Sequence, residues 1–229
     1  MASRLFEAVD ALMRVPSVAQ IGGFRPEDHL KSWFGGRFLA QPGQLWPTLD
    51  GAKAVPVIQI CVPELPVTPG PLEGKEIIQI FVSQVELPID LPATNGHGFL
   101  VRELALNNLE EAPDSPTLDY PKAFQIKWLQ GKPEGPVWEE LPFHVSWELI
   151  TEHVEGEDPF REYSDRYFGH PNTKVGGWAT YIQGLAQVPE TYVIQVSSEP
   201  KPGFGIGDSG NMYFYISAAG EWSMSWDCY

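Results

Sequence analysis

The spacing of apolar residues at the start of the chain is that of a helix. One face of this first segment would carry Leu5, Phe6, Val9, Leu12 and Met13. Because such positions recur every three or four residues, the pattern predicts an N-terminal amphipathic helix. Ser3 is placed to cap this helix and Pro16 to end it.

A second short helix is expected to begin at Pro26. Glu27 and Asp28 would lie in its first turn, where acidic side chains favour the helix dipole. Its apolar face would carry Leu30, Trp33 and Phe34. The glycine pair Gly35-Gly36 would then end it.

The period of the pattern then changes. Residues 55–62 and 77–83 are rich in Val and Ile and predict two strands. The prolines at positions 63, 66, 69 and 71 include a P-x-x-P spacing, which is also found in polyproline ligands. Because two strands need a connection at this point, we interpret the proline segment as a loop.

The middle and the end of the chain add further elements. Residues 124–128 and 145–149 alternate apolar and polar side chains, which predicts strands with one solvent-exposed face. Asp158-Pro159 has the chemistry of a helix start. The face of that helix would carry Phe160, Tyr163, Tyr167 and Phe168. The aromatic run 212–216 predicts a core strand.

Comparison of the two ends of the chain indicates an internal duplication. Phe34-Gly-Gly36 followed by residues 57–60 and 77–83 has a counterpart in Val175-Gly-Gly177 followed by residues 193–196 and 211–217, at an offset of roughly 135 to 140 residues. Each copy would be a Gly-Gly turn followed by two strands. Neither copy can bury its inner face alone, so the two should pack as one pseudo-symmetric unit.

The predicted fold is therefore of the α+β class and mostly β, with internally duplicated antiparallel β units, an N-terminal helix and short peripheral helices. We expect one domain over residues 1–229. The first repeat would span about 26–90 and the second about 170–229, with a β-rich connecting segment at 91–169.

Charge narrows the possible functions. The 229-residue chain has a formal net charge of −15. An acidic surface repels nucleic acid and anionic lipid and attracts basic partners, although it also simply keeps a protein soluble. We therefore expect no nucleic-acid or membrane partner. With two cysteines and no basic, apolar leader at the start, the sequence predicts a cytoplasmic protein.

Gly205-x-Gly207-x-x-Gly210 matches the dinucleotide-binding fingerprint. That fingerprint must open a helix, whereas a strand is predicted here, so we interpret it as a tight turn. Six glycines are expected to form structural turns of this kind: Gly35, Gly36, Gly176, Gly177, Gly207 and Gly210.

Other catalytic motifs are absent from the sequence. No nucleophile elbow, zinc-protease motif or phosphate-binding loop occurs, and the five histidines are scattered. The acidic residues of the turns lack the spacing of a metal site and are expected to be solvated: Glu110, Glu111, Asp114, Glu155, Glu157 and Asp158. A triad of Cys228 with a distant histidine is possible, but we expect a packed thiol. We predict no cofactor, no metal and no catalytic residue.

Several motifs resemble the YwqG-like family of uncharacterised, mostly bacterial proteins. They are Phe34-Gly-Gly-Arg-Phe-Leu-Ala40, Leu45-Trp-Pro-Thr48, Gly176-Gly-Trp-Ala-Thr-Tyr-Ile-Gln183, Gly207-Asp-Ser-Gly-Asn-Met-Tyr-Phe-Tyr-Ile216 and Trp226-Asp-Cys-Tyr229. The resemblance implies a duplicated, mostly β fold with no established activity, and a role as an immunity protein beside a secreted toxin. The chain lacks the C-x-x-C pair that many relatives carry after Trp46-Pro47, and has Thr173 where relatives tend to have His.

Two functions follow as hypotheses. The first is a non-enzymatic acidic binding protein, in its sharpest form an immunity protein that neutralises a basic toxin. The alternative is a small-molecule enzyme or ligand-binding protein, with a cleft between the repeats to which Asp208, Gln59 and Gln195 would contribute. Asp208 is expected either to fix its own turn by bonding backbone amides or to face a cleft or partner.

Overall fold

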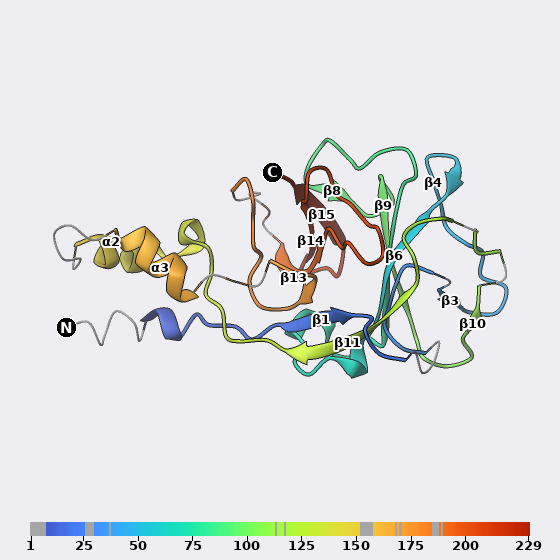
Figure 1. Ribbon diagram of the computed structural model, residues 1–229, viewed down its shortest axis with the longest axis horizontal. Helices are drawn as coiled ribbons and strands as arrows, with labels where there is room; N and C mark the ends of the chain where they lie inside the picture. Colours follow the sequence, from blue (N-terminus) through green and yellow to red (C-terminus); the bar gives the residue numbers. More distant parts are fainter. Residues whose placement is uncertain are drawn as a thin grey trace.

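The computed structural model describes residues 8–229 except 26–29, 37, 113, 117, 152–157, 168, 170, 185–187 and 189. Its main feature is one curled, 11-stranded antiparallel sheet with the order β8-β15-β14-β13-β12-β1-β11-β2-β6-β7-β9 (Figure 1). In chain order these strands are β1 (Ser17–Ile21), β2 (Trp33–Phe34), β6 (Val55–Cys61), β7 (Ile77–Val82), β8 (Ala93–Thr94), β9 (Phe99–Leu104), β11 (Phe124–Gln130), β12 (Lys174–Val175), β13 (Thr191–Ser197), β14 (Asn211–Ile216) and β15 (Trp222–Asp227).

The strand order is symmetric about the central pair, β1 and β11. Outward from that pair, one half runs β1, β12, β13, β14, β15 and the other runs β11, β2, β6, β7, β9; the short strand β8 extends the first of these beyond β15 without a counterpart. The Gly-Gly turn follows β2 in one half and β12 in the other, as the duplication hypothesis requires. The central strands β1 and β11, and the edge strands β8 and β9, lie outside the ranges predicted for the two repeats.

Register and hydrogen bonds repeat between the halves. The pairing of β6 with β7 shifts between Pro56 and Ile58, and the pairing of β13 with β14 shifts between Tyr192 and Ile194. The Gly35 N–H donates to Val57 O and the Gly176 N–H donates to Val193 O, both at 2.8 Å. The two halves therefore share backbone geometry as well as strand order.

The predicted strands at 55–62, 77–83, 124–128 and 212–216 are confirmed as β6, β7, β11 and β14. The proline segment forms two short 3-10 turns, η1 (Val62–Glu64) and η2 (Gly70–Leu72), within the β6–β7 connection. Smaller pairings join β3 (Leu39–Ala40) to β10 (Glu110–Glu111), and β4 (Thr48–Leu49) to β5 (Ala52–Lys53).

Residues 145–149 do not form the predicted strand but lie within α2 (Phe143–Thr151). Val145 is buried, whereas Trp147 is exposed. Five alternating residues fit a strand, but positions i and i+4 also share one face of a helix. The short run was therefore ambiguous, and the prediction of a strand is wrong.

The predicted helices have different outcomes. Helix α3 (Pro159–Tyr167) is confirmed, and the Asp158 carboxylate caps it by accepting a hydrogen bond from Phe160 N (3.1 Å). At the N-terminus, residues 8–10 are helical; Ser3, Leu5 and Phe6 lie outside the described residues. Pro26, Glu27 and Asp28 also lie outside them, but Trp33 and Phe34 form β2, so the helix predicted to include them is wrong there.

Both halves contribute to one hydrophobic core. Phe34, Ile58 and Ile80 of one half join Val175, Ile194 and Phe214 of the other in a single buried cluster. Helices α2 and α3 lie beside the N-terminal segment, at the end of the molecule away from β9 and β10 (Figure 1). None of the helices in the described part of the chain is long and apolar enough to cross a membrane.

The Gly-Gly turn gives a direct test of backbone packing. Gly35 has φ of 62°, and a Cβ there would lie 2.6 Å from Pro121 O and 2.8 Å from Lys122 O. Gly43 also has a positive φ (77°), but nothing lies within 4 Å of its Cβ position. We expect Gly43→Ala to cost about 1 kcal/mol and Gly35→Ala at least about 3 kcal/mol in urea unfolding, because only Gly35 adds a backbone clash. Equal losses would contradict this packing.

Candidate functional site

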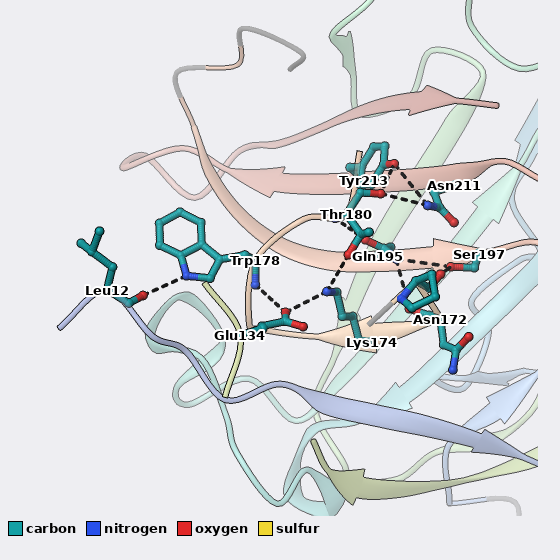
Figure 2. A network of polar contacts seen from close by, with 11 residues as sticks. Leu12, Glu134, Asn172, Lys174, Trp178, Thr180, Gln195, Ser197, Asn211 and Tyr213 are labelled. Atoms are coloured by element: carbon teal, nitrogen blue, oxygen red, sulfur yellow. Dashed lines mark hydrogen bonds and ion pairs between the residues drawn. The ribbon is translucent and has the colours of Figure 1, made fainter. Parts of the chain in front are cut away.

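Gln59 and Gln195, predicted as binding residues, are both buried. Gln59 Oε1 accepts a hydrogen bond from Leu39 N (3.1 Å), and its Nε2 donates to Lys31 O (2.9 Å). Gln195 makes the equivalent bonds in the other half, from Thr180 N (2.9 Å) and to Asn172 O (3.1 Å; Figure 2). Each side chain therefore fastens the loop that contains the Gly-Gly turn of its own half.

The structure does not bring Gln59 and Gln195 together around a cleft. They lie on β6 and β13, and β2, β11, β1 and β12 separate these strands in the sheet. Asp208, the third predicted residue, is exposed. The three residues therefore do not form one site.

Asp208 does not make the predicted side-chain bonds to its own turn. The turn is closed by Gly210 N, which donates to Ile206 O (2.7 Å), and the backbone carbonyl of Asp208 accepts from Tyr229 N (3.1 Å). Gly207 supplies a positive φ of 48°, and a Cβ on Gly210 would overlap the backbone oxygen of Asp227. The glycines and the backbone hydrogen bonds to the C-terminal segment hold this turn in place. The turn therefore does not need a hydrogen bond from the Asp208 side chain. The turn leads into β14, so it does not open the helix that a dinucleotide site needs.

Asp227 has the anchoring role that the sequence suggested for Asp208. Its carboxylate accepts hydrogen bonds from Ile182 N (2.8 Å), Gln183 N (3.1 Å) and the Tyr213 hydroxyl (2.7 Å). It thereby fixes the loop that follows the second Gly-Gly turn. The only sequence signal was its place in the closing Trp226-Asp-Cys-Tyr229 motif.

A buried ion pair, not predicted from the sequence, joins Lys174 of the second half to Glu134 of the segment after β11. Lys174 Nζ lies 2.7 Å from Glu134 Oε1 and donates to Thr180 Oγ1 (3.0 Å), and both charged side chains are almost fully buried. Glu134 Oε1 also accepts from Trp178 N (2.7 Å), and Trp178 Nε1 donates to Leu12 O (2.9 Å; Figure 2). Burial lowers the pKa of the Lys174 ammonium, and the Glu134 carboxylate opposes that shift.

This ion pair breaks the symmetry of the fold. Lys174 pairs with Gln195 as Trp33 pairs with Gln59, so a lysine occupies the position of a tryptophan in the other half. A buried ion pair seldom adds stability, because desolvation offsets the attraction between the charges. The two halves therefore differ in side-chain chemistry at this shared position.

A cavity of about 230 Å³ lies next to this network. Thr180 and Gly169 line it, and both also adjoin Lys174: a Cβ on Gly169 would lie 3.1 Å from Lys174 Nζ. The other walls include four aromatic residues, from α3, from η3 (Trp138–Glu140) and from the loop held by Asp227: Trp138, Phe160, Tyr163 and Tyr181. A partly open cavity with aromatic walls and a few polar groups has the lining of a ligand site.

Helix α2, which precedes the cavity-lining helix α3 in the chain, presents an apolar face to solvent. Phe143, Trp147 and Ile150 are 79%, 55% and 51% exposed, and their spacing places them on one side of the helix. The rings of Phe143 and Trp147 stack with centroids 6.0 Å apart. We call these three residues the α2 face.

The remaining candidate chemistry is limited. Burial raises the pKa of the Cys61 thiol to about 11, which keeps it protonated at neutral pH. Cys228 is half-buried and packs against Gly207. Within the described ranges, His, Cys, Asp and Glu nowhere gather in threes that could hold a metal ion.

Comparison with protein-family models identifies the family to which the chain belongs. Residues 32–220 match the model of the domain of unknown function DUF1963, so the chain belongs to that family. A comparison with curated proteins found no match. The matched range includes both Gly-Gly turns, the ion pair and the cavity.

The two aspartates provide a matched test of the C-terminal half. We expect Asp208→Ala to change the free energy of unfolding by less than about 0.5 kcal/mol, because its carboxylate is exposed. Asp227→Ala should cost at least about 2 kcal/mol, because three donors lose a charged acceptor. Thermal and urea unfolding of both variants would measure this, and the reverse order would contradict the assigned roles.

The ion pair is tested by removing one charge or both. Lys174→Met leaves the Glu134 carboxylate buried without its counter-charge and should cost about 3–5 kcal/mol. The double variant Lys174→Met/Glu134→Gln should regain part of that loss, because neither charge remains. Lys127→Met, at an exposed position on β11, is the control. A loss below about 1 kcal/mol in Lys174→Met would contradict the buried pair.

Proposed function

We propose that this member of the DUF1963 family is a non-enzymatic binding protein that docks a basic protein partner on the α2 face. The exposed apolar α2 face, in a chain with a net charge of −15, is the observation that carries this proposal. Such a face is costly in a soluble protein unless a partner covers it.

The spacing of the α2 face suits a common mode of recognition. Apolar residues at i, i+4 and i+7 of an amphipathic helix insert into a groove of the partner. Aromatic residues are enriched among those that dominate interface energies, so Phe143 and Trp147 are the expected anchors. Solvent already contacts much of both side chains, so docking needs no rearrangement of the core.

Charge selects the partner. A net charge of −15 accelerates the encounter with a basic protein and disfavours acidic ones. Desolvation of the α2 face would then supply most of the affinity, since charges at an interface rim contribute more to rate than to strength. A basic protein with an apolar groove therefore fits both properties of the surface.

The more specific form of this proposal is a cytoplasmic immunity protein. Many toxins that act on nucleic acid are basic, and an acidic inhibitor can cover their active sites. The YwqG-like resemblance of the sequence implies the same role. On this hypothesis the partner is a basic toxin encoded beside the gene for this protein.

Co-expression tests the proposal. The full chain, carrying an affinity tag, would be produced with each basic protein encoded next to its gene, and the complex would be isolated and its Kd measured at low and high salt. We expect Phe143→Ser/Trp147→Ser to weaken binding at least about 30-fold, as loss of an anchor of 2 kcal/mol or more does. Association should also slow as salt increases.

Ile89→Ser is the matched control, because Ile89 is 78% exposed but lies far along the chain from α2. It should leave both Kd and melting temperature unchanged. A complex that forms equally well with the double α2 variant would overturn the assignment of the surface. Failure of every neighbouring basic protein to bind would overturn the immunity hypothesis.

A further inference from the structure

We propose that the aromatic cavity beside α3 is a binding site for an alkylammonium group. The group is either part of a free small molecule or the end of a lysine side chain on a partner. This inference does not depend on the α2 face, which does not line the cavity.

The first argument is the arrangement of the rings. The Trp138 ring meets Phe160 at 5.9 Å and 69°, and meets Tyr163 at 5.6 Å and 78°. Rings that meet nearly at right angles form a corner, and Tyr181 lines the cavity as well. Such aromatic enclosures bind organic ammonium ions, because the negative faces of the rings attract a cation.

The second argument is that the tyrosine hydroxyls are already engaged. The Tyr163 hydroxyl donates to Pro136 O (2.8 Å), and the Tyr181 hydroxyl lies 3.1 Å from the Tyr215 hydroxyl. Burial raises the pKa of both phenols, so they stay neutral. The rings therefore offer a ligand their π surfaces rather than their polar ends, which favours a cation without strong hydrogen-bonding demands.

The third argument is charge. Glu139 lines the cavity and is exposed at its edge, and none of the described lining residues carries a positive charge. Glu140, the next residue, does not line the cavity and interacts electrostatically with the Arg14 guanidinium. Lys174, behind the cavity floor, is compensated by Glu134 at 2.7 Å. The local field therefore favours a cation over an anion or a neutral ligand.

Size limits the ligand. Pockets for drug-sized molecules measure about 300–1,000 Å³, whereas this cavity is about 230 Å³. It suits a compact group such as trimethylammonium or the end of a lysine side chain. Phe160, half exposed at the opening, would leave the rest of a longer ligand in solvent.

Calorimetric titration of the full chain at low salt tests the site with three probes. Choline supplies a free ammonium, and 3,3-dimethylbutan-1-ol is its neutral analogue of the same shape. The peptide acetyl-Gly-Lys-Gly-amide presents an ammonium on a side chain. We expect saturable binding of choline, of the peptide or of both, and at least about tenfold weaker binding of the neutral analogue.

Binding of choline alone would support a free ligand, and binding of the peptide alone would support a partner's lysine. Equal binding of the neutral analogue, or no binding of either cation, would overturn the proposal. Phe160→Leu should weaken binding about fivefold and Trp138→Leu about tenfold, with folding checked by thermal melts.

Phe143→Ser/Trp147→Ser serves as the control that separates the two proposals. It should leave cation binding unchanged, because neither residue lines the cavity. Loss of cation binding in this variant, with its melting temperature unchanged, would contradict the assignment of the site to the aromatic cavity. Conversely, loss of the protein partner with retained choline binding would show that the cavity and the α2 face act independently.

Discussion

A buried glutamine amide in each half is the interaction on which the loops of this protein depend. Gln59 and Gln195 each accept from one backbone N–H and donate to one carbonyl on either side of a Gly-Gly turn. An amide suits this task because it offers a donor and an acceptor at fixed separation. Without it, the loop would carry unpaired polar groups into the core, at a cost in stability. The loop from Trp178 to Gln183, which forms part of the ion-pair network and of the cavity wall, is therefore positioned from within the sheet.

The same scaffold supports different chemistry in its two halves. Gln79 Nε2 donates to Leu39 O (2.8 Å) in the first half, and the Tyr213 hydroxyl, which donates to Asp227, also lies 2.8 Å from the equivalent Thr180 O in the second. Arg102 completes the first cluster through Gln79 Oε1 (2.9 Å). Shared backbone geometry with divergent side chains is what a duplicated unit permits, because each loop keeps its anchor while its neighbours change. The cavity and the buried ion pair lie where the loop of the second half meets the connecting segment from Glu134 to Gly169.

The elements that could be predicted from the sequence are the long strands and the turns that recur in both halves. The Val- and Ile-rich strands carry a strong pattern, and the two Gly-Gly turns reveal the duplication. The helix α2 was missed because residues 145–149 fit two periods. Glu134 and Lys174 were missed because residues that meet only through tertiary structure leave no local spacing to detect. Gln59 and Gln195 were correctly noticed as equivalent, but the sequence could not show that each faces its own loop rather than a shared cleft.

The central pair of strands has a consequence for how the chain reaches its fold. Strand β1 lies between β11 and β12, so Ser17 pairs with Gln130 and with Val175. At a synthesis rate of about 5–20 residues per second, β1 emerges from the ribosome on the order of ten seconds before β12. Sheets built from such distant contacts form slowly, because the chain loses the entropy of closing a long loop before the stabilising strand pairs form. Strand β1 can therefore pair with β11 only after residue 130 has been made, and its second edge stays open until β12 follows about 45 residues later.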